Sequence, residues 1–350
     1  MPRRCVALKN ADQNRKSLET PRALSFLLGL TKFGETFQDR SISSLPVMIN
    51  TASPSLTSRS QTAQPNLRAT QIAVKFWGVR GSVPTPVETH HRYGGNTACV
   101  EITLGGQHLI FDGGTGIVNL GHHLHRQSEQ GQQAPLCSSM FFTHTQWDRI
   151  QGFPFFKPAF APKNQFTVYG GTAPNGASIK HCLTDQMLLP HFTVPLQNML
   201  ARLSFKTLFR GTHFNIGDVE VEVQEITPLE EAQGYRLTWQ GCTIVYATDT
   251  PKAHVELDFL QLADQADLLI YDGTYDDLSY LHHQPAGGAA IEIKPWETAT
   301  ELAQKANVKK LVLLHHSPVQ DDVTLDQLQI DIRDRVPSAT IAYEGLVIEP

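Results

Sequence analysis

Short strand-like segments alternate with helical segments from about residue 71 to the C-terminus, and this mixture restricts the folds open to the chain. Ala98–Leu104 and His108–Phe111 are apolar, strand-like runs on either side of Gly105-Gly106, which is typical of a hairpin. The segment Gly116–Arg126, directly after them, has helical periodicity. Hairpins mixed with helices predict an α/β (α+β) protein of mixed sheets covered by helices, and argue against one all-parallel sheet.

The remaining segments continue this pattern to the end of the chain. We expect further strands at Gln71–Trp77, Met140–Thr143, Phe166–Tyr169, Leu203–Phe209, Val219–Ile226, Tyr235–Trp239, Thr243–Ala247, Leu268–Tyr271, Leu311–Leu314 and Thr340–Val347. We expect further helices at Ile179–Leu189, His254–Ala263, Trp296–Asn307 and Leu325–Asp334.

Residues 1–70 differ in composition from the rest. They are rich in Ser, Thr, Gln, Asn and Arg, and they lack hydrophobic periodicity outside Ala23–Leu30. Such a composition cannot bury a core. We therefore predict a basic, disordered N-terminal extension (1–70) and one folded domain (71–350). Two alternatives stay open: the extension is an organellar transit peptide, against which its acidic residues argue, or translation starts at Met48 rather than Met1.

The charge distribution disfavours one class of partner. The chain has a formal net charge of −5, but residues 1–70 hold ten Lys/Arg against four Asp/Glu. This leaves 19 Lys/Arg against 30 Asp/Glu, a net charge of −11, for residues 71–350. Binding to a nucleic-acid backbone needs a basic face. Nucleic acid is therefore not expected as a partner of the folded domain.

The cysteines and the apolar segments indicate a cytoplasmic protein without a membrane anchor. The five cysteines are widely spaced and include no C-x-x-C pair, which argues against a disulfide framework and against a cysteine zinc knuckle. The apolar run Ala23–Leu30 is far too short to span a bilayer. Organellar targeting by the extension is the alternative to a cytoplasmic location.

The most informative segment is FFTHTQWDRIQGFPFF (Phe141–Phe156), in which an apolar strand ends and a polar cluster follows. Here the chain resembles the metallo-β-lactamase-fold hydrolases, in particular the branch with an H-T-H-W-D-H-I-Q-G-F-P-F-F signature that includes cyclic-phosphate and nucleotide phosphodiesterases. The resemblance continues through KFWGVRGSVPTP, RYGGNTACVEI, FDGGTG, YATDT and LVLLHHSP, and covers nearly all of residues 72–320. It implies an αββα sandwich of two mixed sheets, with metal-dependent hydrolysis of a phosphodiester or cyclic phosphate at the sheet ends.

The resemblance also implies which residues belong to the metal site. His144 and Asp148 match the signature, Asp249 matches the aspartate that bridges two ions, and His315 matches the last metal histidine. If the site is active, Asp148 and Asp249 are its catalytic residues. Asp112 resembles the aspartate that orients a metal-bound histidine, although a turn-forming role among glycines explains it equally well.

Four positions depart from the family pattern. Gln146 and Arg149 stand in place of two signature histidines, Pro228 in place of a third, and Ile293 in place of the histidine that resembles a proton donor. A mononuclear zinc site needs three protein ligands and a water, whereas a dinuclear centre needs more ligands than remain. We expect at most one ion, Zn²⁺ or Mn²⁺, or none.

The arginine changes the electrostatics of the predicted site. A guanidinium is always positive and pairs with carboxylates through its planar fork, so an Arg149 that does not swing away would occupy the place of an ion beside Asp148 and Asp249. Alternatively, His144, Asp148, Asp249 and His315 form only a hydrogen-bonded polar cluster. Arg149 cannot lower the pKa of a water enough to make hydroxide at neutral pH, as a metal ion does. Two-metal hydrolysis is therefore not expected.

Three functional interpretations stay open. The chain is a catalytically degenerate protein with a binding or regulatory role, whose ligand is a small phosphorylated molecule. Alternatively, it is a weak mononuclear phosphodiester hydrolase, or a scaffold for an unknown protein partner. A ligand would contact Arg149, Arg80 and Asn96, although ordinary loop hydrogen bonds are the alternative for Arg80 and Asn96.

The aromatic residues of the signature segment have a simpler explanation than ligand binding. We interpret Trp147, Phe153, Phe155 and Phe156 as core or pocket-wall residues rather than as a platform for base stacking.

Overall fold

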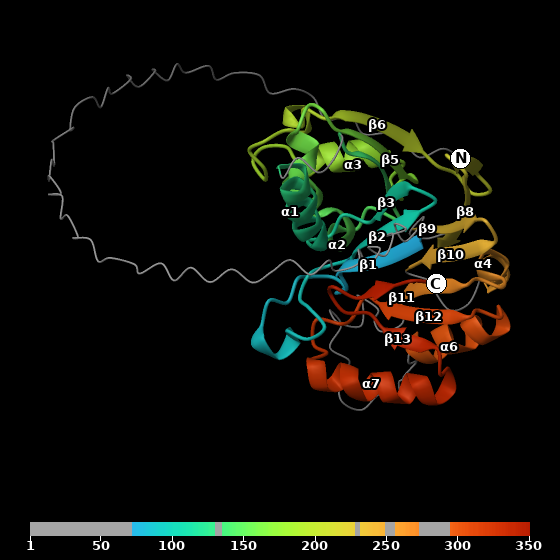
Figure 1. The fold of residues 1–350 in the computed structure, drawn as a ribbon. Helices are drawn as coiled ribbons and strands as arrows, with labels where there is room; N and C mark the ends of the chain where they lie inside the picture. The colour runs from blue at the N-terminus through green and yellow to red at the C-terminus, as the bar shows by residue number, and fades with distance from the viewer. Residues whose placement is uncertain (1–71, 130–134, 228–231, 249–255, 273–294) are drawn as a thin grey trace, which may run out of the picture. The chain divides into compact units, whose positions relative to one another are not determined.

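Two mixed sheets lie face to face, and helices cover both outer faces (Figure 1). The computed structural model describes residues 72–129, 135–227, 232–248, 256–272 and 295–350. The predicted extension, residues 1–70, lies outside the described residues. The αββα arrangement confirms the predicted fold class.

The first sheet has the strand order β14-β1-β2-β3-β4-β5-β6 and the second has the order β13-β12-β11-β10-β9-β8-β7. The strands of the first sheet are β1 (Ile72–Gly78), β2 (Cys99–Leu104), β3 (Gln107–Phe111), β4 (Cys137–Phe142), β5 (Gln165–Gly170), β6 (Arg202–Thr207) and β14 (Val347–Ile348). Those of the second are β7 (His213–Ile216), β8 (Val219–Thr227), β9 (Ala232–Trp239), β10 (Cys242–Ala247), β11 (Leu268–Asp272), β12 (Lys310–Leu314) and β13 (Ala339–Ile341).

The described helices are α1 (Gly116–Glu129), α2 (Trp147–Ile150), α3 (Ile179–Asp185), α4 (Glu256–Ala263), α6 (Pro295–Lys305) and α7 (Asp322–Arg335). Short 3-10 helices occur at Glu88–His90, Phe153–Phe155, Lys157–Phe160 and Leu196–Asn198. The first three α-helices pack on the first sheet and the last three on the second.

Both sheets combine parallel and antiparallel pairs. In the first sheet β1, β2 and β3 pair antiparallel, whereas β3 to β6 run parallel. In the second sheet β7 to β10 pair antiparallel, whereas β10 to β13 run parallel. Each sheet therefore has a group of parallel strands whose carboxyl ends lie at one edge, where loops bring side chains together.

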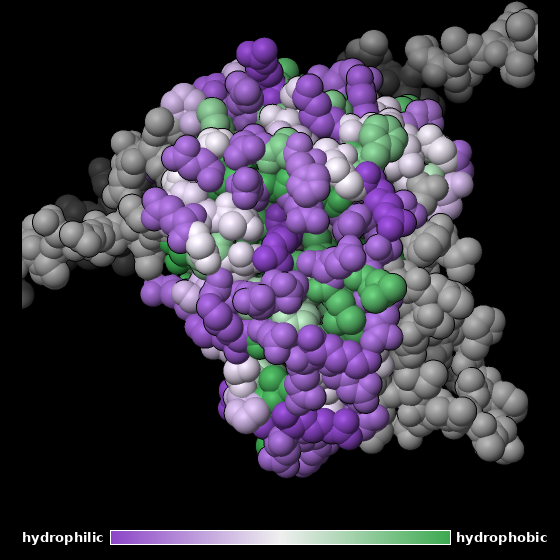
Figure 2. Space-filling view, turned by 90° about the vertical axis from the view of Figure 1, so that its right-hand side faces the viewer, coloured by the Kyte–Doolittle hydropathy of each residue, from purple (hydrophilic) through white to green (hydrophobic). Residues whose placement is uncertain are grey.

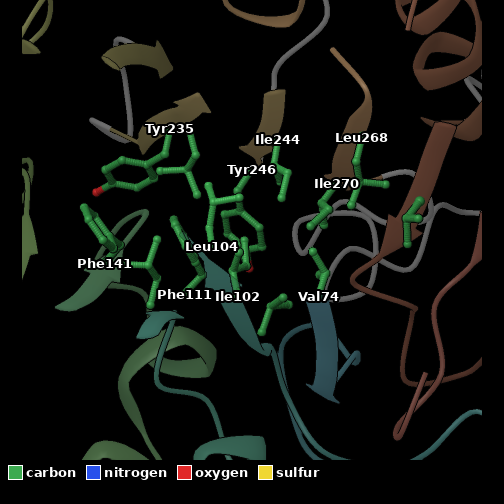
Figure 3. Close-up of a cluster of buried hydrophobic side chains, with 14 of the residues drawn as sticks. Val74, Ile102, Leu104, Phe111, Phe141, Tyr235, Ile244, Tyr246, Leu268 and Ile270 are labelled. Carbon is green, nitrogen blue, oxygen red and sulfur yellow. The ribbon is translucent and has the colours of Figure 1, made fainter. Parts of the chain in front are cut away.

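The central core fills the space between the two sheets (Figure 3). Alternate residues of each strand point inward, as the period of a strand requires. The rings of Phe111 and Phe141 from the first sheet stack with centroids 4.9 Å apart, and Tyr246 from the second sheet packs 5.0 Å from Phe111. This packing fixes the ends of β3, β4 and β10 relative to one another.

Two sequence predictions about strands were wrong. The expected strand Thr340–Val347 is two strands, β13 and β14, that belong to different sheets. The backbone turns between them, with Gly345 at a φ of 89°, and the chain crosses from the second sheet to the first. The short strand β7, at the edge of its sheet, was not predicted at all.

The face drawn in Figure 2 is largely hydrophilic, with hydrophobic residues in small patches. Within the described part of the chain, no helix has the length and hydrophobicity needed to cross a bilayer.

Candidate functional site

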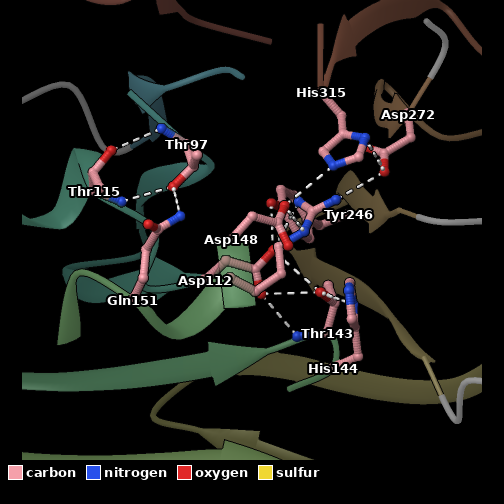
Figure 4. A network of polar contacts seen from close by, with 11 residues as sticks. Thr97, Asp112, Thr115, Thr143, His144, Asp148, Gln151, Tyr246, Asp272 and His315 are labelled. Atoms are coloured by element: carbon pink, nitrogen blue, oxygen red, sulfur yellow. Dashed lines mark hydrogen bonds and ion pairs between the residues drawn. The ribbon is translucent and has the colours of Figure 1, made fainter. Parts of the chain in front are cut away.

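Polar side chains from both sheets converge at the carboxyl ends of parallel strands (Figure 4). Asp112 follows β3 and His144 comes two residues after β4, whereas Asp272 ends β11 and His315 follows β12. The short helix α2 then supplies Asp148. Residues far apart in sequence are therefore brought together by the parallel pairing of β3 with β4 and of β11 with β12.

The glycines after Asp112 let the backbone approach α2 closely. The Gly113 N–H donates to the Arg149 carbonyl at 2.6 Å, and the Gly152 N–H donates to the Gly113 carbonyl at 2.9 Å. A Cβ atom on Gly114 would lie 2.5 Å from the Asp148 carbonyl oxygen. The glycines thus form a close strand-to-helix turn that fixes the position of α2 and its side chains.

The guanidinium of Arg149 is fully buried and lies among three carboxyl groups. Its Nη2 donates to Asp272 Oδ2 at 2.8 Å, and its Nη1 donates to Asp112 Oδ2 at 3.3 Å. Its Nε lies 3.3 Å from Asp148 Oδ2. All three nitrogens of the planar fork therefore face carboxylate oxygens, which is the preferred environment of a buried arginine.

Asp112 is held by donors from both sheets. The Thr143 N–H and hydroxyl donate to Oδ1 at 2.9 and 3.0 Å, and the Tyr246 hydroxyl donates to Oδ2 at 2.9 Å. Burial raises the pKa of Asp112 above its ordinary value, although the charges of Arg149 and His144 act in the opposite direction. Its backbone has a φ of 58°, a left-handed conformation that a residue other than glycine rarely adopts.

His315 lies between two carboxyl groups. Its Nε2 is 3.1 Å from Asp148 Oδ2 and its Nδ1 is 3.5 Å from Asp272 Oδ2. The residue has a φ of 67°. A Cβ atom on Gly81 would lie only 2.6 Å from His315 Nε2, so the glycine backbone packs directly on the ring. The imidazole orientation is therefore fixed from several sides.

Opposing effects act on Asp148. Burial by itself would raise its pKa, but the charge of Arg149 and the hydrogen bond with His315 together outweigh burial and lower the pKa below its ordinary value. Asp148 is therefore a buried carboxylate that depends on its cationic neighbour.

His144 is buried beside this cluster and is linked to it through Thr143. Its Nδ1 is 3.0 Å from the Thr143 hydroxyl, which also donates to Asp112. His144 also lines a crevice too tight to admit a water molecule, together with Phe142, Thr145, Gly170, Gly171, Thr172 and Ile179. Gln146 is half-buried at the start of α2.

The donor set described here does not fit a dinuclear metal centre. Within the described ranges, no three His, Cys, Asp or Glu side chains are grouped so as to hold an ion. Arg149 lies between the acidic side chains that could otherwise bind a metal ion. The predicted positions Asp249, Pro228 and Ile293 lie outside the described residues.

The two other residues predicted to contact a ligand make internal hydrogen bonds. Arg80 is fully buried, and it donates from Nε to the Gly94 carbonyl and from Nη1 to the Gln320 carbonyl, both at 2.7 Å. Asn96 donates from Nδ2 to Glu344 Oε2 at 3.0 Å. These contacts join loops to one another, and a ligand-binding role for either residue stays a prediction.

Of the four aromatic residues in the segment Phe141–Phe156 that we interpreted as core or pocket wall, two lie in the core. Phe153 and Phe156 are buried core residues. Trp147 and Phe155 are 60% and 56% exposed, so neither is a core residue. The reason is that α2 is a single turn whose first residue points outward while Asp148, Arg149 and Ile150 are buried.

Sequence reasoning missed Asp272. The residue is the last of the strand LLIYD and is 7% exposed, and it contacts both Arg149 and His315. An acidic residue that ends an apolar strand is a usable signal, because the carboxyl ends of parallel strands carry functional side chains.

The comparisons with known proteins agree with this architecture. A family model described as a β-lactamase superfamily domain matches residues 107–316. This match covers more than half of the chain, so the chain belongs to that superfamily. No curated protein matches the chain.

Three solved structures show the same fold at low sequence identity. Human tRNase Z, short form, is 18% identical with a TM-score of 0.52, over 79% of this chain and 98% of that one. A diphosphatase from the PhnP family is 14% identical with a TM-score of 0.53, over 80% and 98%. Zn²⁺-bound PqqB from Methylobacterium extorquens is 14% identical with a TM-score of 0.55, over 79% and 100%.

Proposed function

We propose that this chain is a non-hydrolytic member of the β-lactamase superfamily that binds a small phosphorylated molecule in a binding or regulatory role. The observation that carries the proposal is the position of Arg149, buried at the strand ends with its guanidinium facing Asp112, Asp148 and Asp272. The resemblance places two metal ions at this position in catalytic relatives.

The chemistry of hydrolysis requires more than a fixed positive charge. A metal ion activates a water by lowering its pKa and also holds a phosphoryl oxygen. The Arg149 guanidinium cannot coordinate a water as a metal ion does, and its nitrogens already face carboxylate oxygens. It therefore cannot generate the hydroxide that hydrolysis requires.

The ligand class is carried over from relatives. The names of tRNase Z and of the PhnP-family diphosphatase refer to substrates that contain phosphate. The exposed indole of Trp147, next to Asp148, supports a ligand that also carries a flat ring, because aromatic faces stack on rings. A nucleotide therefore suits the site better than inorganic phosphate.

One observation favours the alternative of a weak mononuclear hydrolase. Asp148 Oδ2 lies 3.1 Å from His315 Nε2, and a carboxylate with an imidazole is part of a donor set that zinc or manganese accepts. This alternative requires Arg149 to leave a fully buried position.

Two measurements on the purified chain test the proposal. We expect no hydrolysis of bis(p-nitrophenyl) phosphate above the rate of the Asp148→Asn variant, with or without added Zn²⁺ or Mn²⁺. We expect at least one of a panel of nucleotides to raise the melting temperature, and Trp147→Ala to reduce that rise while Phe155→Ala leaves it unchanged. Metal-dependent turnover that Asp148→Asn abolishes would support the hydrolase instead. If neither turnover nor a thermal shift is observed, the scaffold interpretation is favoured.

A further inference from the structure

We propose that the Arg149 guanidinium replaces a divalent cation as the group that holds the acidic strand ends together, so that the native chain folds without metal and loss of the guanidinium opens a cation site. This inference deepens the proposed function and rests on the same residues, but it concerns the folded state and metal binding rather than turnover.

The three carboxyl groups that face the Arg149 guanidinium lie on different elements of the fold. Asp112 follows β3 of the first sheet, Asp272 ends β11 of the second sheet, and Asp148 lies on α2. Arg149 contacts all three through three different nitrogens. A single buried cation therefore connects the two sheets and the intervening helix, as a bound metal ion would.

The negative charges of the three carboxyl groups need a compensating positive charge. All three carboxyl groups are buried, with exposed fractions of 1%, 2% and 7% for Asp112, Asp148 and Asp272. Buried carboxylates in one place repel one another and need either protonation or a cation. Among the described residues, Arg149 is the permanently charged group that contacts all three. Removing one partner of a buried ion pair leaves an uncompensated charge and is strongly destabilising.

The carboxylates around the guanidinium are also held by other contacts. Arg149 contacts Asp148 and Asp272, and both of these carboxylates also contact His315. The ring of His315 is held by the close packing of Gly81. If the guanidinium is truncated, the three carboxylates that faced it, those of Asp112, Asp148 and Asp272, stay around the space it occupied. Carboxylate oxygens are ligands that Zn²⁺ and Mn²⁺ accept, and three protein ligands suffice for a zinc site.

The chain offers a matched control in Arg80. It is also an arginine with no exposed surface, but its hydrogen bonds go to the carbonyls of Gly94, Ser317 and Gln320 rather than to carboxylates. Removing Arg80 therefore deletes an equally buried guanidinium that donates to carbonyls, with Asp322, Glu344 and Asp321 acting on it only through their charges. A general effect of losing a buried arginine would appear in both variants, and cation binding only in the Arg149 variant.

The experiment compares the wild type, Arg149→Ala and Arg80→Ala, each dialysed against Zn²⁺ or Mn²⁺ and then against buffer. Metal content per chain and melting temperature with and without a chelator are measured. We expect a metal-free wild type whose melting temperature does not change with chelator. Arg149→Ala is expected to retain about one ion per chain, and its melting temperature should rise by roughly 5 °C at a hundredfold excess of Zn²⁺ over Kd. Arg80→Ala should do neither.

A second measurement decides the question if Arg149→Ala does not fold. Asp272→Asn removes one of the carboxyl groups that Arg149 neutralises, so it should raise the yield and melting temperature of Arg149→Met. The same change should give no rescue to Arg80→Met, because Arg80 makes no contact with Asp272. Absence of rescue in the Arg149→Met background would overturn the inference.

The other overturning results are equally direct. A wild type that retains about one ion per chain and is destabilised by chelator contradicts the inference, and so does a folded Arg149→Ala variant that gains no metal. The two proposals fail separately. A metal-free wild type that hydrolyses a phosphodiester defeats the proposed function alone, whereas a metal-bound but inert wild type defeats this inference alone.

Discussion

The hydroxyl of Tyr246 donates to the Oδ2 atom of Asp112 at 2.9 Å, and this hydrogen bond joins the second sheet to the end of β3 in the first. Tyr246 and Asp112 are both almost completely buried. The same carboxylate oxygen accepts from Arg149. The hydrogen bond therefore connects the sandwich core to the ion cluster at the strand ends.

Tyr246→Phe should destabilise the fold by about 2 kcal/mol, because it leaves a buried carboxylate without one of its donors. Tyr235→Phe is the matched control. Its hydroxyl is also buried but donates to the neutral Phe142 carbonyl, at 2.6 Å. We expect the control to lose about 1 kcal/mol, as measured by urea unfolding of both variants. Equal losses would show that the charge of Asp112 is irrelevant to the hydrogen bond.

Alkaline pH should unfold the protein through its buried tyrosines. Burial raises the pKa of Tyr93 to about 12 and raises the pKa of Tyr235 and Tyr246 well above the ordinary value. In the unfolded chain these phenols ionise near pH 10. The contribution of these neutral tyrosines to the free energy of unfolding is therefore fully present below about pH 10, and it is lost as the pH rises above that value.

A spectrophotometric titration of tyrosine ionisation checks this. Tyr235 and Tyr246 should not ionise before the native circular dichroism signal is lost, and Tyr93→Phe should remove one phenol from the group that titrates near pH 12. Ionisation of all tyrosines near pH 10 in the folded protein would contradict the expectation.

The sequence pattern predicted the fold well where burial alternates regularly along a strand. Val219–Ile226 was expected as a strand and forms most of β8, because alternate apolar residues face the other sheet. The pattern failed at Thr340–Val347, because local β propensity does not reveal that the chain leaves one sheet for the other at Gly345. That crossing depends on tertiary contacts, such as the Glu344 N–H donating to the Tyr93 carbonyl.

The candidate site was only partly accessible from sequence. The family resemblance identified His144, Asp148 and His315, and the replacement of a histidine by Arg149 predicted a guanidinium beside Asp148. Asp272 was not foreseen, because the sequence does not state which strand ends are neighbours. Only the parallel pairing of β11 with β12 brings Asp272 next to His315.

Acid should destabilise the protein through His316. Burial, together with the charge of Arg80, lowers the pKa of this imidazole to about 3 in the folded state. In the unfolded chain it takes up a proton near pH 6.5. The contribution of the neutral His316 to the free energy of unfolding is therefore fully present above about pH 6.5. It is lost as the pH falls toward 3, by about 1.4 kcal/mol for each pH unit in between.

The free energy of unfolding of His316→Gln, measured from pH 7 to pH 4, should fall less steeply than that of the wild type. His191→Gln, at an exposed histidine, is the control for the loss of an imidazole. A slope that is the same in all three proteins would show that other groups control the acid limb.

Gly81→Ala tests how strongly the site depends on the position of His315. The added Cβ would lie 2.6 Å from His315 Nε2, closer than any real contact, and neither the buried ring nor the backbone can move far. We expect a loss of about 2 kcal/mol, since inserting a methyl group into a filled interior forces side chains from their preferred positions. In a His315→Ala background the ring is absent, so the same substitution should cost less than half as much. Urea unfolding of the four proteins gives this coupling. An unchanged cost in the His315→Ala background would mean that Gly81 is required by its backbone rather than by the imidazole.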